Sequence, residues 1–233
     1  MRKRSLLVSI KKLGRPVFTT FELSALSGKS LSAVTQALNN LVKDELVIKV
    51  YRGIWAEAGS EGLSPYAVIP YLLARHRAYV SFVSALHLHN MIEQIPQMIT
   101  LASTSHTKII RTKLGVFSFH QLTPEFFNGF NWYKGTGKFL IAEPEKALVD
   151  SLYLSARKKK QFASFPELYF PKAFSFKKIR YWVGCIPDSK IRAYVLKRID
   201  ALSLAHNSQL THNTMVKHDY LLQRTRPARQ RRL

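Results

Sequence analysis

The sequence predicts an α+β protein in which an N-terminal winged helix-turn-helix is followed by a mixed α/β C-terminal domain. Two observations lead to this fold class. Between Thr19 and Trp55, two stretches with helical apolar spacing flank Gly28, and two short strand-like runs follow them directly. After residue 65, strand-like and helix-like runs occur in the order helix, strand, strand, strand, helix, which is typical of a mixed domain.

The N-terminal segment Ser5–Leu13 is expected to form the first helix of this module. Its apolar side is made by Leu6, Leu7, Ile10 and Leu13. Gly14-Arg15-Pro16 ends the helix, and Val17-Phe18 adds a short third strand to the sheet of the hairpin.

A second, short helix is expected at Thr20–Leu26. Thr20 is the candidate N-cap, which places Leu23 at the third helical position, so a cap is predicted without a capping box. Gly28 interrupts the pattern, as a turn between two crossing helices requires.

The next helix, Ser30–Lys43, is the candidate recognition helix, with Ser30 as its N-cap. Its buried stripe is predicted to contain Leu31, Val34, Leu38, Leu41 and Val42. The opposite face carries short polar or basic side chains and no acid: Ser32, Thr35, Gln36, Asn39 and Lys43. Such groups suit phosphate oxygens and base edges, and Thr35, Gln36 and Asn39 are the candidate base contacts.

The strands Leu46–Val50 and Gly53–Ala56 follow, joined by a turn that contains Arg52. A basic hairpin tip can lie along a phosphate backbone, and the flanking cations Lys11, Lys12 and Arg15, with Arg2-Lys3-Arg4, can contact phosphates too. The simpler interpretation is a helix pair with a solvated polar face followed by an ordinary hairpin. The short helix spacing, the acid-free face and the basic hairpin favour double-stranded DNA as the partner.

Composition supports a polyanionic partner. The 233 residues carry a formal net charge of +22, and basic side chains exceed acidic ones in every part of the chain, so binding should depend strongly on salt. No apolar run approaches the ~20 residues that span a bilayer, and no amphipathic basic helix with an aromatic face favours a membrane surface. Lys11-Lys12 follows too closely for a signal peptide, and Cys185 is the single cysteine, so we expect a cytoplasmic protein without disulfides or a cysteine-based zinc finger.

The larger region follows a Gly/Ser-rich linker, Glu57–Pro65. We therefore expect a DNA-binding domain at residues 1–57, a second domain at 66–206 and a basic, disordered tail at 207–233. The elements expected in the second domain are the helices Tyr66–Leu73, Val80–Met91, Glu143–Ala156 and Ile186–Leu204, and the strands Met98–Ala102, Val116–Gln121 and Lys138–Ala142, with a basic loop at Ser103–Leu114.

Enzymatic activity is the weaker interpretation, and no catalytic residue, metal ligand or cofactor is predicted. His87 and His89 are two residues apart, so on a helix they point in different directions. Three acids, Glu143, Glu145 and Asp150, lie on one short helix, where a surface ion pair between Glu143 and Lys146 is expected. The glycine-containing run at 134–138 precedes a strand, whereas a P-loop lies between a strand and a helix.

Two further basic stretches are candidate nucleic-acid contacts. Arg157 precedes the run Lys158, Lys159 and Lys160 at the end of the Glu143–Ala156 helix, where part of the charge can compensate the helix dipole. The tail ends in an arginine-rich sequence that includes Arg229, Arg231 and Arg232, which could enter a minor groove or remain solvated. The aromatic side chains between 162 and 176 can stack on bases, but a core role is favoured.

Two motifs in the second region resemble the AbiEi family of antitoxins and regulators from bacterial toxin–antitoxin and phage-defence operons. They are Ser84-Ala85-Leu86-His87 with Gln94-Ile95-Pro96, and Ala142-Glu143-Pro144-Glu145-Lys146-Ala147-Leu148 with Asp150. The resemblance covers roughly residues 5–200. It implies an N-terminal DNA-binding domain that represses its own operon, and a C-terminal domain that counteracts a nucleotidyltransferase-like toxin, often without a stable complex. Because repressors often place two modules on an inverted repeat, we expect the operator to contain inverted repeats. Direct binding of the toxin and, less favoured, a nucleic-acid-processing enzyme are the alternatives.

Overall fold

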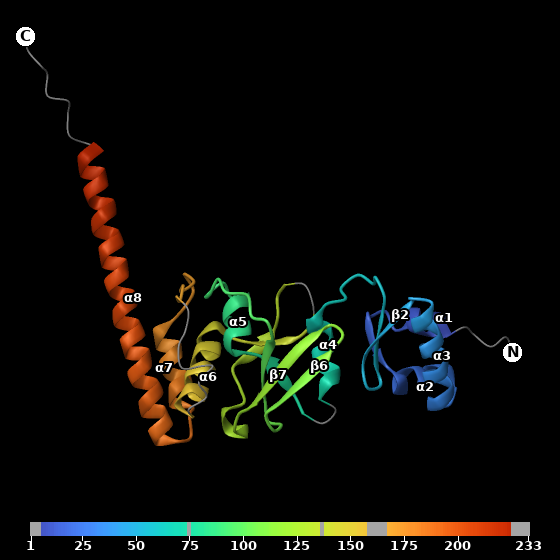
Figure 1. Ribbon diagram of the computed structural model, residues 1–233. Helices are drawn as coiled ribbons and strands as arrows, with labels where there is room; N and C mark the ends of the chain where they lie inside the picture. Colours follow the sequence, from blue (N-terminus) through green and yellow to red (C-terminus); the bar gives the residue numbers. More distant parts are fainter. Residues whose placement is uncertain (1–5, 74–75, 136–137, 158–166, 225–233) are drawn as a thin grey trace, which may run out of the picture.

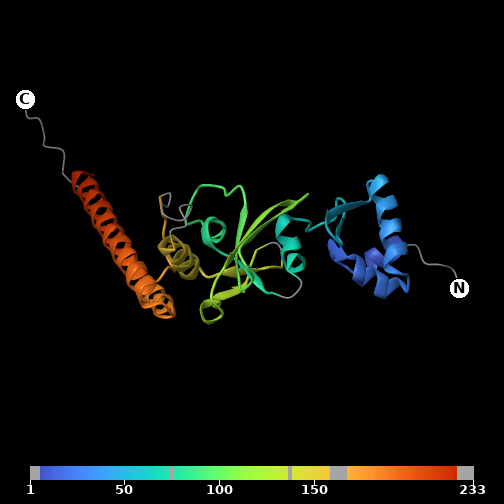
Figure 2. The same ribbon diagram turned by 60° about the horizontal axis from the view of Figure 1, so that its bottom comes forward.

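The computed structural model describes residues 6–73, 76–135, 138–157 and 167–224, with side chains described up to residue 206. These residues form a mixed α/β chain with a three-stranded and a six-stranded sheet. Three N-terminal helices lie at one end of an elongated molecule, the larger sheet lies in the middle, and α6, α7 and α8 lie at the other end (Figures 1 and 2). None of the described helices is long and apolar enough to cross a lipid bilayer.

The first six elements are close to the predicted ones. They are α1 (Leu6–Lys12), β1 (Val17–Thr19), α2 (Thr20–Ser27), α3 (Leu31–Lys43), β2 (Val47–Tyr51) and β3 (Ile54–Glu57). The three strands form an antiparallel sheet in the order β1-β3-β2, which confirms the expected third strand at Val17-Phe18.

The cap of α2 differs from the prediction. Thr19, not Thr20, is the N-cap, because Thr19 keeps an extended backbone as the last residue of β1. This shift places Glu22 at the third helical position, where its carboxylate accepts a hydrogen bond from the Thr19 amide at 2.8 Å. The amide of Glu22 in turn donates to the Thr19 hydroxyl at 3.2 Å. A capping box is therefore present.

The helix α3 begins and is packed largely as expected. Gly28 has φ +68°, the left-handed conformation that ends α2, and the Ser30 hydroxyl accepts a hydrogen bond from the Ala33 amide. Val34 and Leu38 are fully buried. Leu31 was wrongly predicted to be buried: it is 51% exposed, because the small core beneath α3 is formed by other residues of the helix and does not include Leu31.

The three-stranded sheet is buried on both faces. On one face, Phe18, Val47 and Trp55 pack with α1, α2 and α3 in a small core. On the other face, strand residues that point the opposite way pack into the core of the larger region: Val17, Val50, Ile54 and Ala56. Side chains of a strand alternate between its two faces, so this short sheet joins the N-terminal helices to the rest of the chain.

The larger region is built around a mixed sheet in the order β6-β7-β5-β4-β9-β8. Its elements are α4 (Pro65–Leu72), β4 (Ala78–Val80), α5 (Phe82–Leu88), β5 (Ile99–Ser103), β6 (Lys108–Thr112), β7 (Gly115–Gln121), a 3-10 turn η1 (Pro124–Phe126), β8 (Phe130–Trp132), β9 (Leu140–Ala142), α6 (Pro144–Ala156), α7 (Phe176–Gly184) and α8 (Ser189–Arg224). The central strand β4 pairs antiparallel with β5 and parallel with β9.

Several predictions for this region were wrong. The helix expected at Val80–Met91 begins only at Phe82, because Val80 pairs with Leu101 in β4. The expected loop Ser103–Leu114 contains the edge strand β6, in which Lys108, Ile109 and Arg111 are exposed while Ile110 is buried. The strand β8 and the helix α7 were not predicted.

The C-terminal helix is longer than expected. α8 continues to Arg224, although disorder was predicted from residue 207. The segment 207–224 contains neither Gly nor Pro and includes several good helix formers, and the next helix breaker is Pro227. Residues 225–233 lie outside the described part of the chain.

A fully buried ion pair lies at the centre of the larger region. Lys146 and Asp150, one turn apart on α6, form a salt bridge with both side chains fully buried. Asp150 also accepts hydrogen bonds from the Tyr79 hydroxyl at 3.0 Å and the Ser81 hydroxyl at 2.7 Å. The Lys146 ammonium lies 3.7 Å from the ring centroid of Phe126, a cation–π distance.

The surface pair expected between Lys146 and Glu143 is therefore wrong. Every residue of α6 from Glu145 to Ser155 is buried, so Lys146 points into the protein, and Glu143 pairs with Lys178 of α7 at 3.0 Å. Burial raises the pKa of Asp150 and lowers the pKa of Lys146, and the charge of each partner opposes the shift of the other.

We expect Asp150→Asn to destabilise the fold by about 3–5 kcal/mol, because it leaves the Lys146 ammonium buried without a counter-charge. The double variant Lys146→Met with Asp150→Asn should recover most of this loss, since the amide still accepts from Tyr79 and Ser81 and no charge remains. Urea unfolding of the three proteins measures both effects. A single variant that is no less stable than the double variant would contradict this role of the pair.

Candidate nucleic-acid interface

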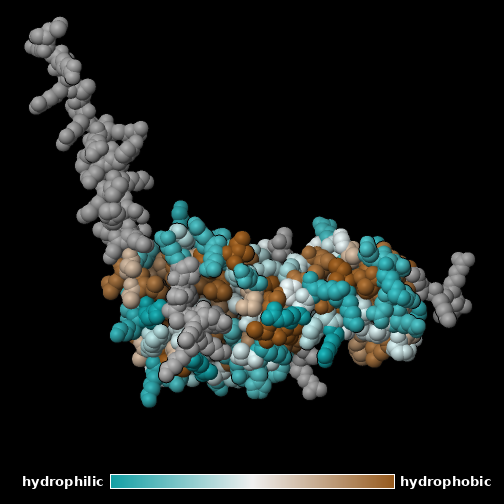
Figure 3. Space-filling view, in the orientation of Figure 1, coloured by the Kyte–Doolittle hydropathy of each residue, from teal (hydrophilic) through white to brown (hydrophobic). Residues whose placement is uncertain are grey.

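The exposed side of α3 forms one continuous polar stripe. Ser32, Gln36, Asn39 and Lys43 are all exposed, and their spacing of four, three and four residues aligns them along one face. No carboxylate lies within this stripe, and the nearest acids, Asp44 and its neighbour, follow after the helix has ended. Figure 3 shows hydrophilic side chains over much of this end of the molecule, interrupted by hydrophobic patches on its upper part and at its lower edge.

Thr35 differs from the other predicted contacts. Its side chain is half-buried, and its hydroxyl donates a hydrogen bond to the Leu31 carbonyl at 2.8 Å. The hydroxyl is thus engaged with the backbone of its own helix, so Gln36 and Asn39 are the two predicted base contacts with exposed amide groups.

The β2–β3 hairpin presents a basic tip beside these helices. Tyr51 and Ile54 are paired, so Arg52 and Gly53 alone form the turn, and Gly53 has φ +70°, which glycine adopts without strain. The Gly53 carbonyl accepts a hydrogen bond from the Thr20 amide at 3.0 Å, which attaches the tip to the start of α2. Arg52 is exposed and has no carboxylate partner within the described residues.

The three flanking cations behave differently from one another. Lys11 lies 3.8 Å from the Glu57 carboxylate, and Arg15 forms an ion pair with Glu22. Lys12 is exposed without a carboxylate partner among the described residues. Of these three, Lys12 has the fully available charge that a phosphate contact requires.

The remaining predicted contacts cannot be placed. Lys158, Lys159, Lys160, Arg229, Arg231 and Arg232 lie outside the described residues, as do Arg2, Lys3 and Arg4. Arg157 is described, and its guanidinium lies 4.7 Å from the ring centroid of Tyr153. Of the aromatic stretch that follows, Phe170, Phe174 and Phe176 pack against the larger core, in keeping with the predicted core role.

The acids considered for catalysis and His89 have structural partners, whereas the buried Nδ1 of His87 has no hydrogen-bond partner among the described residues. Glu145 is buried, accepts a hydrogen bond from the Ser175 amide at 3.0 Å and lies 3.7 Å from the Lys178 ammonium, so it joins α6 to the start of α7. His89 bonds through Nε2 to the Ala142 carbonyl at 2.7 Å. Across the described ranges, no three His, Cys, Asp or Glu side chains gather closely enough to hold a metal ion.

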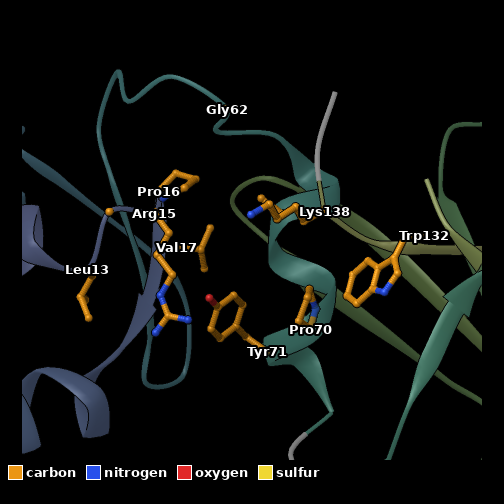
Figure 4. Close-up of a pocket in the computed structure, with 11 residues that line it drawn as sticks. Leu13, Arg15, Pro16, Val17, Gly62, Pro70, Tyr71, Trp132 and Lys138 are labelled. Atoms are coloured by element: carbon orange, nitrogen blue, oxygen red, sulfur yellow. The ribbon is translucent and has the colours of Figure 1, made fainter. Parts of the chain in front are cut away.

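A cleft that the sequence did not predict lies between the segment 13–17 and the helix α4. It has a volume of about 620 Å³, and Figure 4 shows Arg15 of the segment 13–17 facing Tyr71 of α4 across it, with the Lys138 side chain pointing toward them. A smaller hollow of about 180 Å³ shares Pro70 and Trp132 with this cleft. The lining residues come from four separate segments, so no local motif in the sequence indicates the cleft. Trp132, close in sequence to Lys134 and Lys138, is one feature that could have pointed to it.

The comparison with known proteins identifies no relative. No protein-family model matches the chain, and no curated protein matches its sequence.

We expect stability to fall as the pH decreases below about 6.5, the ordinary pKa of histidine. Burial lowers the pKa of His89, against the smaller opposing effects of the Ala142 carbonyl and Glu145. The folded protein therefore binds fewer protons than the unfolded chain in this range, and acid favours unfolding. Unfolding free energies between pH 7 and 5 measure the slope.

The variant His89→Gln keeps an amide donor but cannot titrate, so its stability should depend less on pH in this window. His106→Gln is the matched control, because His106 is exposed. Equal slopes for the wild-type protein and His89→Gln would exclude His89 as the source.

Proposed function

We propose that the chain is a DNA-binding transcriptional autorepressor and antitoxin of the AbiEi type. In this proposal residues 6–57 act as a winged helix-turn-helix, with α3 in the major groove and the β2–β3 hairpin along the phosphate backbone. The observation that carries the proposal is the exposed, carboxylate-free stripe of α3 in the same small helix–sheet unit as a hairpin tip whose arginine has no carboxylate partner among the described residues.

The chemistry of the stripe supports base reading. The amides of Gln36 and Asn39 each offer a donor and an acceptor, which matches the adenine edge in the major groove. Ser32 and Lys43 at the two ends of the stripe suit phosphate oxygens. Thr35 is the least favourable of the base-contact candidates, since its hydroxyl bonds to Leu31.

The antitoxin role is proposed because the second region resembles the AbiEi family. In this role the second domain would counteract a nucleotidyltransferase-like toxin without forming a stable complex with it. A second candidate is direct binding of the toxin, and one feature favours it. The structure contains an uncharged hollow of about 400 Å³ whose lining includes Val83, Ile95 and Met98. The side chain of Ile95 is 76% exposed there. Exposed apolar side chains around a hollow are typical of protein contacts. Co-purification of the product of a neighbouring gene would distinguish the two.

The double variant Gln36→Ala with Asn39→Ala should bind operator DNA less selectively. The difference in binding free energy between operator and random DNA should shrink by about 1–3 kcal/mol for each lost base contact. Arg52→Ala should weaken operator and random DNA similarly and lower the salt slope by about one, because a phosphate contact carries no sequence information. Titrations of the chain's own promoter region and of random duplex at several salt concentrations measure these quantities.

Lys197→Ala is the matched charge control, since it removes one exposed cation from α8 at the far end of the molecule. A double variant of α3 that keeps the full specificity ratio would show that α3 does not read bases. A change in the ratio for Arg52→Ala would contradict the phosphate assignment.

A further inference from the structure

The cleft beside α4 and the smaller hollow next to it present one exposed aromatic ring. Trp132 lines both, and it is 64% exposed on β8, an edge strand of the six-stranded sheet. The other two tryptophans of the chain behave as core residues, with Trp55 1% and Trp182 9% exposed. An indole ring left in water offers a flat stacking surface that the fold itself does not use.

Basic side chains line the two hollows that share this ring. Arg15 and Lys138 line the cleft and Arg77 lines the smaller hollow, and no carboxylate is among the described residues of either lining. Arg15 is already paired with Glu22, but Arg77 and Lys138 are exposed and have no ion-pair partner among the described residues. The site thus carries an uncompensated positive charge close to an aromatic face.

We propose that the cleft and the adjoining smaller hollow together bind a nucleotide unit, with its base stacked on the shared Trp132 and its phosphate attracted by the cations of the two linings, Lys138 in the cleft and Arg77 in the hollow. Stacking of bases on exposed aromatic rings within a basic groove is the general mode by which proteins bind single-stranded nucleic acid. The volume of about 620 Å³ lies within the range of small-ligand sites. A free nucleotide and a nucleotide within a single strand share this chemistry.

The inference does not depend on the proposed contact of α3 with duplex DNA. None of the stripe residues of α3, nor Arg52, lines the cleft or the smaller hollow. The two sites can therefore be tested and can fail separately.

Tryptophan fluorescence provides a direct test on the full chain, because Trp132 alone among the three tryptophans is largely exposed. A short single-stranded oligothymidylate, or thymidine and adenosine nucleotides, should quench this emission by stacking. An abasic phosphodiester oligomer of the same length should not, although it carries the same charge. Quenching by oligothymidylate but not by free nucleotides would show that the site binds single-stranded nucleic acid. Quenching by the free nucleotides as well would show that it binds individual nucleotides.

The variant Trp132→Ala should bind labelled oligothymidylate roughly 5- to 150-fold more weakly in fluorescence anisotropy, the range found when one stacking side chain is removed. Lys138→Gln and Arg77→Gln should weaken binding and retain the quenching at saturation. Tyr181→Ala is the matched control, since Tyr181 is 63% exposed on α7, away from the cleft.

Two results would overturn the proposal. One is the absence of quenching by base-containing probes, or equal quenching by the abasic oligomer. The other is an unchanged affinity of Trp132→Ala for the oligonucleotide when its unfolding transition matches that of the wild-type protein. Duplex operator affinity should stay unchanged in Trp132→Ala, and the variant Gln36→Ala with Asn39→Ala should keep the quenching, which separates this site from α3.

Discussion

The burial of the three-stranded sheet on both faces is the constraint on which the arrangement of the molecule depends. Trp55 faces the N-terminal helices, and its neighbours Ile54 and Ala56 face the larger core. A hydrogen bond from the Lys113 amide to the Val50 carbonyl at 3.3 Å adds a backbone link between β2 and the β6–β7 hairpin. Because apolar burial on each side opposes separation, α3, the hairpin tip and the cleft keep a defined relation to the six-stranded sheet.

Polar groups in the larger core impose a second constraint. The helix α6 is surrounded by protein, so each charged or hydroxyl group that it buries needs a partner. Lys146, Asp150 and Tyr79 satisfy one another, and Glu145 bonds to the backbone at the start of α7. Glu145, Lys146 and Asp150 thus contribute their charged groups to the packing of α6 against the rest of the larger region.

The sequence predicted the elements whose signal is local. Helical spacing located α1, α2 and α3 within one or two residues, and Gly28 and Ser30 marked a real turn and cap. The prediction failed where tertiary contacts decide the local structure. The charged residues of β6 suggest a loop until its pairing with β7 is known. The spacing of Lys146 and Asp150 is equally compatible with a helix surface, and only the packing of α6 shows that the pair is buried. The cleft was beyond reach for the same reason, because its lining residues come from segments more than a hundred positions apart.

The shared sheet also has a thermodynamic consequence. Since its residues belong to both hydrophobic cores, neither core can lose its structure without exposing apolar surface of the other. The two parts should then melt in one cooperative transition, and any ligand that binds the folded chain would raise the stability of both by the same mass-action term. A ligand bound in the cleft beside α4 would in this way also protect helices distant from the cleft from unfolding, without any change of shape.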